Sequence, residues 1–382
     1  MKNLGTLYRY ELKKIWKRKL TWVVPLALAA LMVYVAIGTA SPDVKKRQQI
    51  LRDGAQRMDG QVMDETFFSA MRKTLSQAGE IGDHYNDLYF YAVNADYYYP
   101  YYMALELDLD PKTATAEDFY NARRALVERM WAAQELTGEE IAYWSAQEMQ
   151  VQQPFTFRST RDGLNACLTV IYGMSTLIPI AVAVCLCGVF SEERRTRTDQ
   201  MIFSSKHGKG TICLAKLLAG ITAALCAAIL VICADSATYA ILDGWNSSDA
   251  AIQIRYLDSS LPITLGQALF MMFGLLLLYG VLCGSATMLV SVWTRNTVAA
   301  LAVPVVFMIA QAWIQLPGLQ AADYLPNQLF NDGYTLCNVR LVGFFGVYLN
   351  NIEFAFLLYG IITVFLIALC WLGWRRNALG KS

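Results

Sequence analysis

The sequence has few charged residues and only two histidines in its 382 residues. Charged side chains make up 16% of the chain, against roughly 25% in an average soluble domain, and 55% of the residues are hydrophobic. His84 and His207 are too few for an HExxH metal motif or a Ser-His-Asp triad. The sequence therefore argues against an ordinary soluble domain, and against both an HExxH metal site and a Ser-His-Asp triad.

Further absences narrow the functional class. None of the nine cysteines lies in residues 43–161, so this segment is not a disulfide scaffold, and no cysteine spacing resembles a zinc site. The phosphate loop GxxxxGK(S/T) is missing, because Phe203 stands where residues 207–211 would need its first glycine. The basic residues form no nucleic-acid module. We expect no metal site, no cofactor and no enzymatic activity in this chain, although a carboxylate-pair enzyme stays open because no spacing singles out a pair.

Long runs without any charge dominate the rest of the chain. Six such windows hold 18 to 36 residues each, at 20–42, 163–191, 217–234, 259–294, 296–322 and 354–374. About 20 apolar residues cross the hydrocarbon core of a bilayer. The sequence therefore predicts an all-α integral membrane protein with six transmembrane helices, the first over residues 21–42. Pro25, Pro179 and Pro304 fall inside these windows and are expected to kink the helices.

The distribution of charge predicts the orientation. Residues 1–20, 191–216, Arg295 and the tail after residue 374 together hold 17 of the 32 basic and only 4 of the 31 acidic residues. Basic loops mark the cytoplasmic side. Both termini and the 191–216 loop are therefore predicted to be cytoplasmic, in agreement with an even number of spans.

A helical domain is predicted outside the membrane, over residues 43–161. Thr115 with Asp118, and Thr137 with Glu140, are spaced like capping boxes, and the neighbourhood of Asp64 is typical of another helix start. The tract from Tyr85 to Tyr102 is rich in tyrosine. Packing within the domain, against its membrane-facing side, explains this tract better than a ligand site or contact with headgroups.

The remaining 162–382 segment carries the other five spans and a predicted re-entrant or interfacial element over 317–352, whose apolar pieces such as Leu341–Leu349 are too short to cross. No ionisable residue lies within the six windows; Lys216 is near the inner face and can snorkel, and Asp235 and Glu353 fall near the outer ends. Gln267, Gln311 and Gln315 can line a translocation path, although hydrogen bonding between helices explains them equally well.

The loop between the second and third spans is the most informative stretch. It runs from Phe190 through Glu192-Glu193-Arg194-Arg195 to a glycine-containing turn, and ends with Ala215-Lys216 at the start of the third span. Before the first span stands Tyr10-Glu11-Leu12-Lys13-Lys14-Ile15. These segments, together with the six-span layout and the large first outer loop, resemble permease subunits of ABC transporters of the ABC-2 type.

The resemblance implies roles for both cytoplasmic segments. The helix over 192–203 would be a coupling helix that docks on a separate cytoplasmic ATPase, with its contacts at Glu192, Glu193, Arg194, Arg195, Arg197 and Asp199. Residues 1–20 would hold the connecting helix beside it, over 3–19, with Lys13, Lys14, Trp16 and Lys17. The interpretation of both segments as solvated loops that only set the topology stays open.

The same resemblance implies partners and a mechanism. ATP and Mg²⁺ would be bound by the partner ATPase, and a second permease copy or a related chain would complete the pore in the cell membrane. Export would proceed by alternating access. The acidic, aromatic outer domain favours cationic amphipathic or antimicrobial peptides as cargo, and the alternative is a membrane receptor or sensor whose outer domain binds a peptide or antibiotic without transport.

Overall fold

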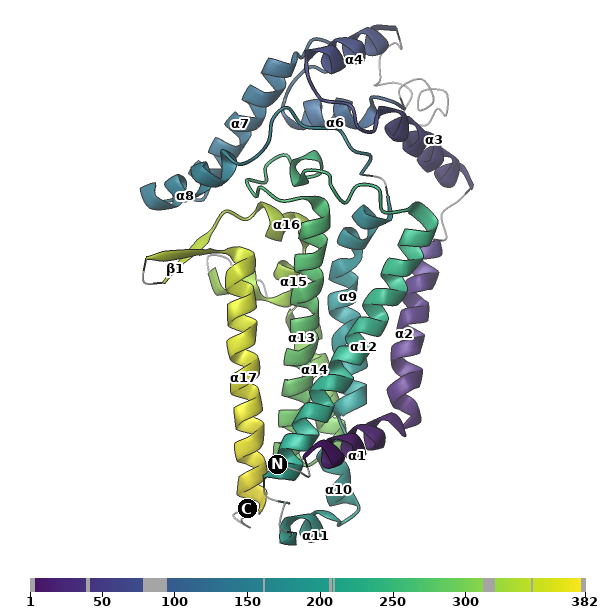
Figure 1. Ribbon diagram of the computed structural model, residues 1–382, viewed down its shortest axis with the longest axis vertical. Coiled ribbons are helices and arrows are strands. Elements are labelled where there is room, and N and C mark those ends of the chain that lie inside the picture. Colours follow the sequence, from purple (N-terminus) through teal and green to yellow (C-terminus); the bar gives the residue numbers. More distant parts are fainter. Residues whose placement is uncertain are drawn as a thin grey trace.

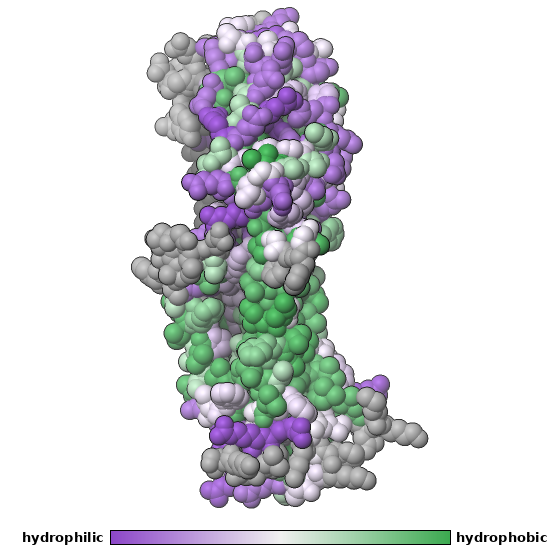
Figure 2. All heavy atoms as spheres, turned by 90° about the vertical axis from the view of Figure 1, so that its left-hand side faces the viewer, coloured by the Kyte–Doolittle hydropathy of each residue, from purple (hydrophilic) through white to green (hydrophobic). Residues whose placement is uncertain are grey.

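A computed structural model of the chain describes residues 4–38, 42–77, 95–160, 162–205, 208, 210–311, 320–344 and 346–378. Long helices form a bundle with a helical domain at one end (Figure 1). The opposite end carries both ends of the described chain, and we call these two ends the domain end and the α1 end. Figure 2 shows a hydrophobic surface over the bundle and a hydrophilic surface over the domain.

Five helices in the described part of the chain are long and apolar enough to cross a membrane. They are α2 (Lys19–Ile37), α9 (Gly163–Leu186), α12 (Thr211–Asp243), α13 (Leu265–Thr294) and α17 (Asn351–Ala378). A helix pairs all its backbone groups internally, which an apolar segment in lipid requires. The predicted all-α membrane fold is confirmed.

The fifth predicted span, in the window 296–322, is described only in part. Helix α14 (Thr297–Gln311) has 15 residues, which at about 1.5 Å per residue is roughly 22 Å and shorter than a hydrocarbon core of about 30 Å. The rest of that window up to residue 319 lies outside the described residues. The described part of the chain therefore contains five of the six predicted spans, and between the fourth and the last of the six it contains the shorter apolar helix α14.

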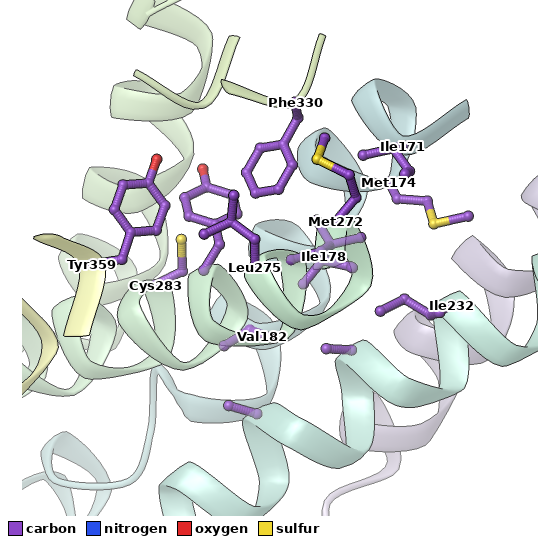
Figure 3. Close-up of a cluster of buried hydrophobic side chains, with 14 of the residues drawn as sticks. Ile171, Met174, Ile178, Val182, Ile232, Met272, Leu275, Cys283, Phe330 and Tyr359 are labelled. Carbon is purple, nitrogen blue, oxygen red and sulfur yellow. The ribbon is translucent and has the colours of Figure 1, made fainter. Parts of the chain in front are cut away.

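Helices α9, α12 and α13 form the centre of the bundle. Their side chains gather in one buried cluster, which includes Ile178 of α9, Ile232 of α12 and Met272 of α13 (Figure 3). A Cβ atom built on Gly284 of α13 would lie only 3.0–3.2 Å from the nearest side chains of α9 and α12. Small residues at such contacts let helices approach closely, which is how helices associate in a membrane.

The domain end consists mainly of five described helices from the first long loop. They are α3 (Pro42–Met58), α4 (Glu65–Gln77), α6 (Tyr98–Glu106), α7 (Ala116–Ala133) and α8 (Gly138–Glu148). Both predicted capping boxes are present, at the starts of α7 and α8. The backbone N–H of Phe67 donates to Asp64 Oδ1 at 3.1 Å, which confirms the third predicted helix start.

Aromatic side chains fill the core of this domain. Phe67, Phe68, Phe119 and Tyr97 are buried in it, and Tyr99 and Tyr101 pack against it. The described end of the tyrosine tract therefore packs inside the domain, whereas residues 85–94 lie outside the described residues. Ile254 and Leu257, which follow α12, also belong to this core, so the domain is not built from 43–161 alone.

The segment before α17 consists of short elements. These are η3 (Gln320–Tyr324), α15 (Pro326–Leu329), α16 (Asp332–Cys337), β1 (Leu341–Phe344) and β2 (Val347–Asn350), while η2 (Ile252–Ile254) follows α12. The short apolar piece at 341–349 is thus an antiparallel hairpin. The ring of Phe330, just after α15, lies 5.3 Å from that of Tyr279, which is halfway along α13.

Candidate functional site: an ion-pair cluster at the α1 end

Four charged side chains from three helices meet at the α1 end, and we call them the ion-pair cluster. Glu11 and Lys14 come from α1 (Leu4–Trp16), Glu193 from α10 (Ser191–Arg195) and Lys216 from the first turns of α12. Lys216 Nζ lies 3.0 Å from Glu11 Oε2 and 2.8 Å from Glu193 Oε1. Lys14 Nζ lies 2.6 Å from Glu193 Oε1 and 3.3 Å from Glu11 Oε2.

The cluster is buried yet electrically balanced. Lys216 is 0% exposed, Glu193 6% and Glu11 8%. Besides its two carboxylate partners, Lys216 donates to the carbonyl oxygen of Val189 at 3.0 Å, so all three of its ammonium protons have acceptors. Two carboxylates oppose two ammonium groups, which is the condition under which charges can be buried.

Local sequence explains why α1 turns these residues inward. Glu11 and Lys14 are three residues apart and therefore share a face of the helix with Leu12 and Ile15, which are buried.

Burial by itself would lower the pKa of Lys14. Its hydrogen bond to Glu193 and the charges of Glu193 and Glu11 have the larger effect and raise the pKa above its usual value. Lys14 is therefore held in its charged form.

A second contact ties α10 to the start of α2. Arg18 forms an ion pair with Glu192 and donates to the carbonyl oxygen of Gly188 at 3.0 Å. The guanidinium fills the space beside Gly188, where a Cβ atom would lie 2.8 Å from Arg18 Nη1. The connection between α1 and α2 is thereby fixed to the connection between α9 and α10.

Aromatic packing joins the same region to α17. The indole of Trp374 lies between Phe190, at a ring distance of 5.4 Å, and Phe203 of α11 (Asp199–Ser204), at 4.9 Å. Trp374 Nε1 donates to the carbonyl oxygen of Gly208 at 3.1 Å. The α10–α11 segment is therefore held by α1, α12 and α17 together.

The predicted single helix over 192–203 is wrong in its geometry. The segment forms two short helices, α10 and α11, with Arg197 between them at a φ of 55°. A left-handed backbone at a non-glycine residue cannot continue a right-handed helix. The break turns α11 toward Trp374.

The six predicted docking residues separate into different environments. The prediction that Glu193 contacts a partner is wrong, because Glu193 is buried in the ion-pair cluster and its carboxylate pairs with Lys14 and Lys216. Glu192 pairs with Arg18 and, at 3.8 Å, with Arg195. Arg195 and Arg197 are exposed and Asp199 is half-buried. Arg194 lies in α10, and its side chain is outside the described part.

The predicted connecting helix is present as α1, and it is shorter than 3–19 because α2 begins at Lys19. Lys13, Trp16 and Lys17 are exposed, whereas Lys14 is half-buried in the cluster. The Trp16 carbonyl oxygen accepts a hydrogen bond of 2.9 Å from Trp22 Nε1. The exposed residues of α1 and those of α10 belong to the same end of the molecule (Figure 1).

Of the three glutamines predicted to line a path, the structure describes Gln267 and Gln311, and each has a partner of its own. Gln267 is exposed at the third position of α13, where it forms a capping box with Thr264. Gln311 is buried at the end of α14, and its backbone carbonyl oxygen accepts a hydrogen bond from Asn327 Nδ2 at 3.0 Å. Gln315 lies outside the described residues. Gln267 is therefore a helix cap, which its spacing from Thr264 could have indicated.

Sequence reasoning missed two buried ionisable residues in the spans. Lys216 was expected to snorkel to the surface but is fully buried in the cluster. Asp235 was expected near an outer end; it is also 0% exposed, and α12 continues eight residues beyond it to Asp243. Glu11 was missed as a partner, although it is the only acidic residue among the first 20.

Comparison with protein families relates the chain to a known family. A family model described as "ABC-2 family transporter protein" matches residues 6–370 of the chain. No curated protein and no solved structure matches it. The matched range includes the whole ion-pair cluster and every helix described above, apart from the first two residues of α1 and the end of α17.

Proposed function

The chain belongs to the ABC-2 family of transporter proteins, and on that premise we propose that its α1 end couples a cytoplasmic ABC ATPase to the membrane helices of an exporter. A member of this family is the permease component of an ABC transporter, which associates with an ABC ATPase and is not itself catalytic. ATP and Mg²⁺ would be bound by that partner. The contacts of the α1 end support this proposal.

The single observation that carries the proposal is the ion-pair cluster. It joins α1, α10 and α12, while Trp374 joins α11 to α17. Oppositely charged groups that are buried and hydrogen-bonded resist separation, because each left alone would be a costly unpaired charge. A partner that displaces α10 and α11 would therefore move the ends of α1, α12 and α17 as one body.

The exposed side of this unit provides a basic docking face. Arg195 and Arg197 are exposed on the α10–α11 segment, and Lys13 and Lys17 are exposed on α1. We propose that these four residues, with Asp199, contact the ATPase, and that Glu192 and Glu193 position them. Charged residues at the rim of an interface mainly set orientation and association rate.

The orientation follows from the charge distribution. The described parts of the basic segments 1–20 and 191–216 lie at the α1 end (Figure 1), and Arg295 bonds there to Asn377 near the end of α17. Positive residues are enriched in cytoplasmic loops. We therefore place the α1 end in the cytoplasm, the domain end outside, and the protein in the cell membrane.

Cargo and mechanism extend this proposal. A second permease, either another copy or a related chain, would complete the pore, and ATP-driven movement of the α1 ends would alternate access between the two sides. The outer domain has more acidic than basic residues and an aromatic core. Its charge suits cationic, amphipathic peptides as the exported substrate.

The proposal is tested by copurification of the tagged permease with its ATPase, followed by ATP hydrolysis in proteoliposomes. The double variant Arg195→Glu/Arg197→Glu should reduce the copurified ATPase severalfold. The matched control is Arg129→Glu, a charge reversal at an exposed arginine (62%) of the domain end. It should have no effect on the amount of ATPase.

A second variant separates positioning from docking. Glu193→Gln changes no exposed group, so it should leave copurification intact while weakening the dependence of ATP hydrolysis on cargo. Equal copurification for Arg195→Glu/Arg197→Glu and wild type would refute the docking face. Absence of any associated ATPase, with the partner genes coexpressed, would instead favour the receptor or sensor interpretation.

A further inference from the structure

A cavity of about 470 Å³ opens on the side of the bundle near the α1 end, and no residue of the ion-pair cluster lines it. It lies between the last turns of α13 and α17. Its lining is Trp293, Arg295, Leu369, Leu372, Gly373, Arg376 and Asn377. None of these residues, all in the described part of the chain, is acidic.

The walls of the cavity are built by close contacts. A Cβ atom on Gly373 would lie 2.5 Å from Trp293 Nε1, so the indole packs directly on the backbone of α17. Leu372, 54% exposed, and Trp293, 61% exposed, present apolar surface on the side of the bundle. Such surface is suited to an acyl chain, and tryptophan is enriched where the bilayer meets water.

Two arginines, Arg295 and Arg376, line the cavity. Arg295 ends α13 with a left-handed backbone, at a φ of 59°, a position that glycine or asparagine usually occupies. Arg295 Nη2 donates to Asn377 Oδ1 at 2.5 Å, and Asn377 Nδ2 donates to the carbonyl oxygen of Val292 at 3.2 Å. These bonds hold the Arg295 guanidinium in place. Arg376 lines the same cavity and makes no ion pair with any described residue.

We propose that this cavity binds the headgroup of an anionic phospholipid, with the phosphate on Arg295 and Arg376 and an acyl chain along Trp293 and Leu372. Guanidinium groups recognise phosphate by paired N–H donors. Basic pockets between membrane helices at the cytoplasmic surface are suited to anionic headgroups. In the orientation proposed above the lipid comes from the inner leaflet.

The test uses the full chain in nonionic detergent, without any ATPase, so its outcome is independent of the proposed coupling. Phosphatidylglycerol or phosphatidylcholine is added, and bound lipid is counted by native mass spectrometry. Arg376→Gln and Arg295→Gln should each weaken phosphatidylglycerol binding about fivefold. The matched control is Arg375→Gln, whose guanidinium stacks on Trp371, 4.6 Å from the ring centre, and which does not line the cavity.

Each outcome decides the matter. A preference for phosphatidylglycerol that is lost in Arg376→Gln and kept in Arg375→Gln supports the site. Arg376→Gln removes no described bond, so its result stays interpretable even where Arg295→Gln fails to fold. Equal binding of the two lipids, or equal losses in Arg375→Gln and Arg376→Gln, would overturn it. Competition by millimolar inorganic phosphate that displaces all bound lipid would show a free-anion site and overturn the lipid as ligand.

Discussion

Replacing Lys216 by methionine tests whether the ion-pair cluster acts as one desolvated unit. Lys216 is 0% exposed, and its ammonium group has three acceptors at 3.0 Å or less, from Glu11, Glu193 and Val189. Methionine has a similar length and no charge. The variant leaves two buried carboxylates opposed by Lys14 alone, and one backbone carbonyl without its donor.

The expected magnitude follows from these contacts. Removing one partner of a buried ion pair costs about 3–5 kcal/mol. Lys14 remains 2.6 Å from Glu193, and its side chain is 34% exposed, so it compensates in part. We expect a loss near the lower limit, about 3 kcal/mol of unfolding free energy. The double variant Lys216→Met/Glu193→Gln restores charge balance and should be more stable than Lys216→Met, at about 1–2 kcal/mol below wild type.

The assay is reversible unfolding of the purified full chain in mixed micelles, followed by tryptophan fluorescence. Lys17→Met is the control, because Lys17 is an exposed lysine of the same end that joins no ion pair among the described residues. A loss below about 1 kcal/mol for Lys216→Met, or additive losses in the double variant, would contradict a desolvated cluster. Either result would mean that water reaches the cluster and screens its charges.

Three further predictions follow from other contacts. Gly163→Ala should destabilise the bundle by more than about 2 kcal/mol, because the new Cβ would lie 2.3 Å from the Tyr239 carbonyl oxygen. Gly173→Ala in the same helix has open space and should be neutral or slightly stabilising. The same unfolding assay distinguishes the two variants, and equal effects would contradict the packing of α9 on α12. Gln267→Ala should cost about 1 kcal/mol through loss of the α13 capping box and leave transport unchanged, so a transport defect at normal stability would restore it to the path. Hydrogen bonds from the Ala116 N–H and from Arg72 hold the pKa of Glu65 below its usual value. The stability that they contribute is therefore present above about pH 4.3 and is lost as pH falls through the lowered pKa, which should speed hydrogen exchange at the start of α7. Glu65→Gln should flatten this acid dependence of exchange, and an unchanged acid dependence would contradict the role of the carboxylate.

Local patterns in the sequence predicted the elements that depend on local physics. Apolar windows predicted five described membrane helices, because a run of about 20 residues without charge has no better environment than lipid. The spacing of Thr115 with Asp118 and of Thr137 with Glu140 predicted two helix starts, because a cap bonds residues only three apart. The family resemblance rested on the loop over 190–216, on residues 10–15 and on the layout of spans, and it was confirmed.

The same local reasoning failed where the outcome depended on residues far apart. Glu193 looked like a surface contact because its neighbours are charged, yet its partners are 179 and 23 positions away along the chain. Gln267 looked like a polar residue within a span because the charge-free window starts before the helix does. The loop was predicted as one helix, yet its backbone is left-handed at Arg197 and Phe203 of α11 packs on Trp374, which is 171 positions away along the chain.

Composition and periodicities of three or four residues predicted a helical membrane protein with basic segments on one side and a helical domain on the other. The resemblance to a family, carried by short cytoplasmic segments and the layout, indicated a permease. Which charges are buried together could be seen only in the folded chain, where Glu11, Lys14, Glu193 and Lys216 meet. The physical reason is that a charge is stable inside the bundle only beside its partner, and the packing of α1, α10 and α12 brings these partners together.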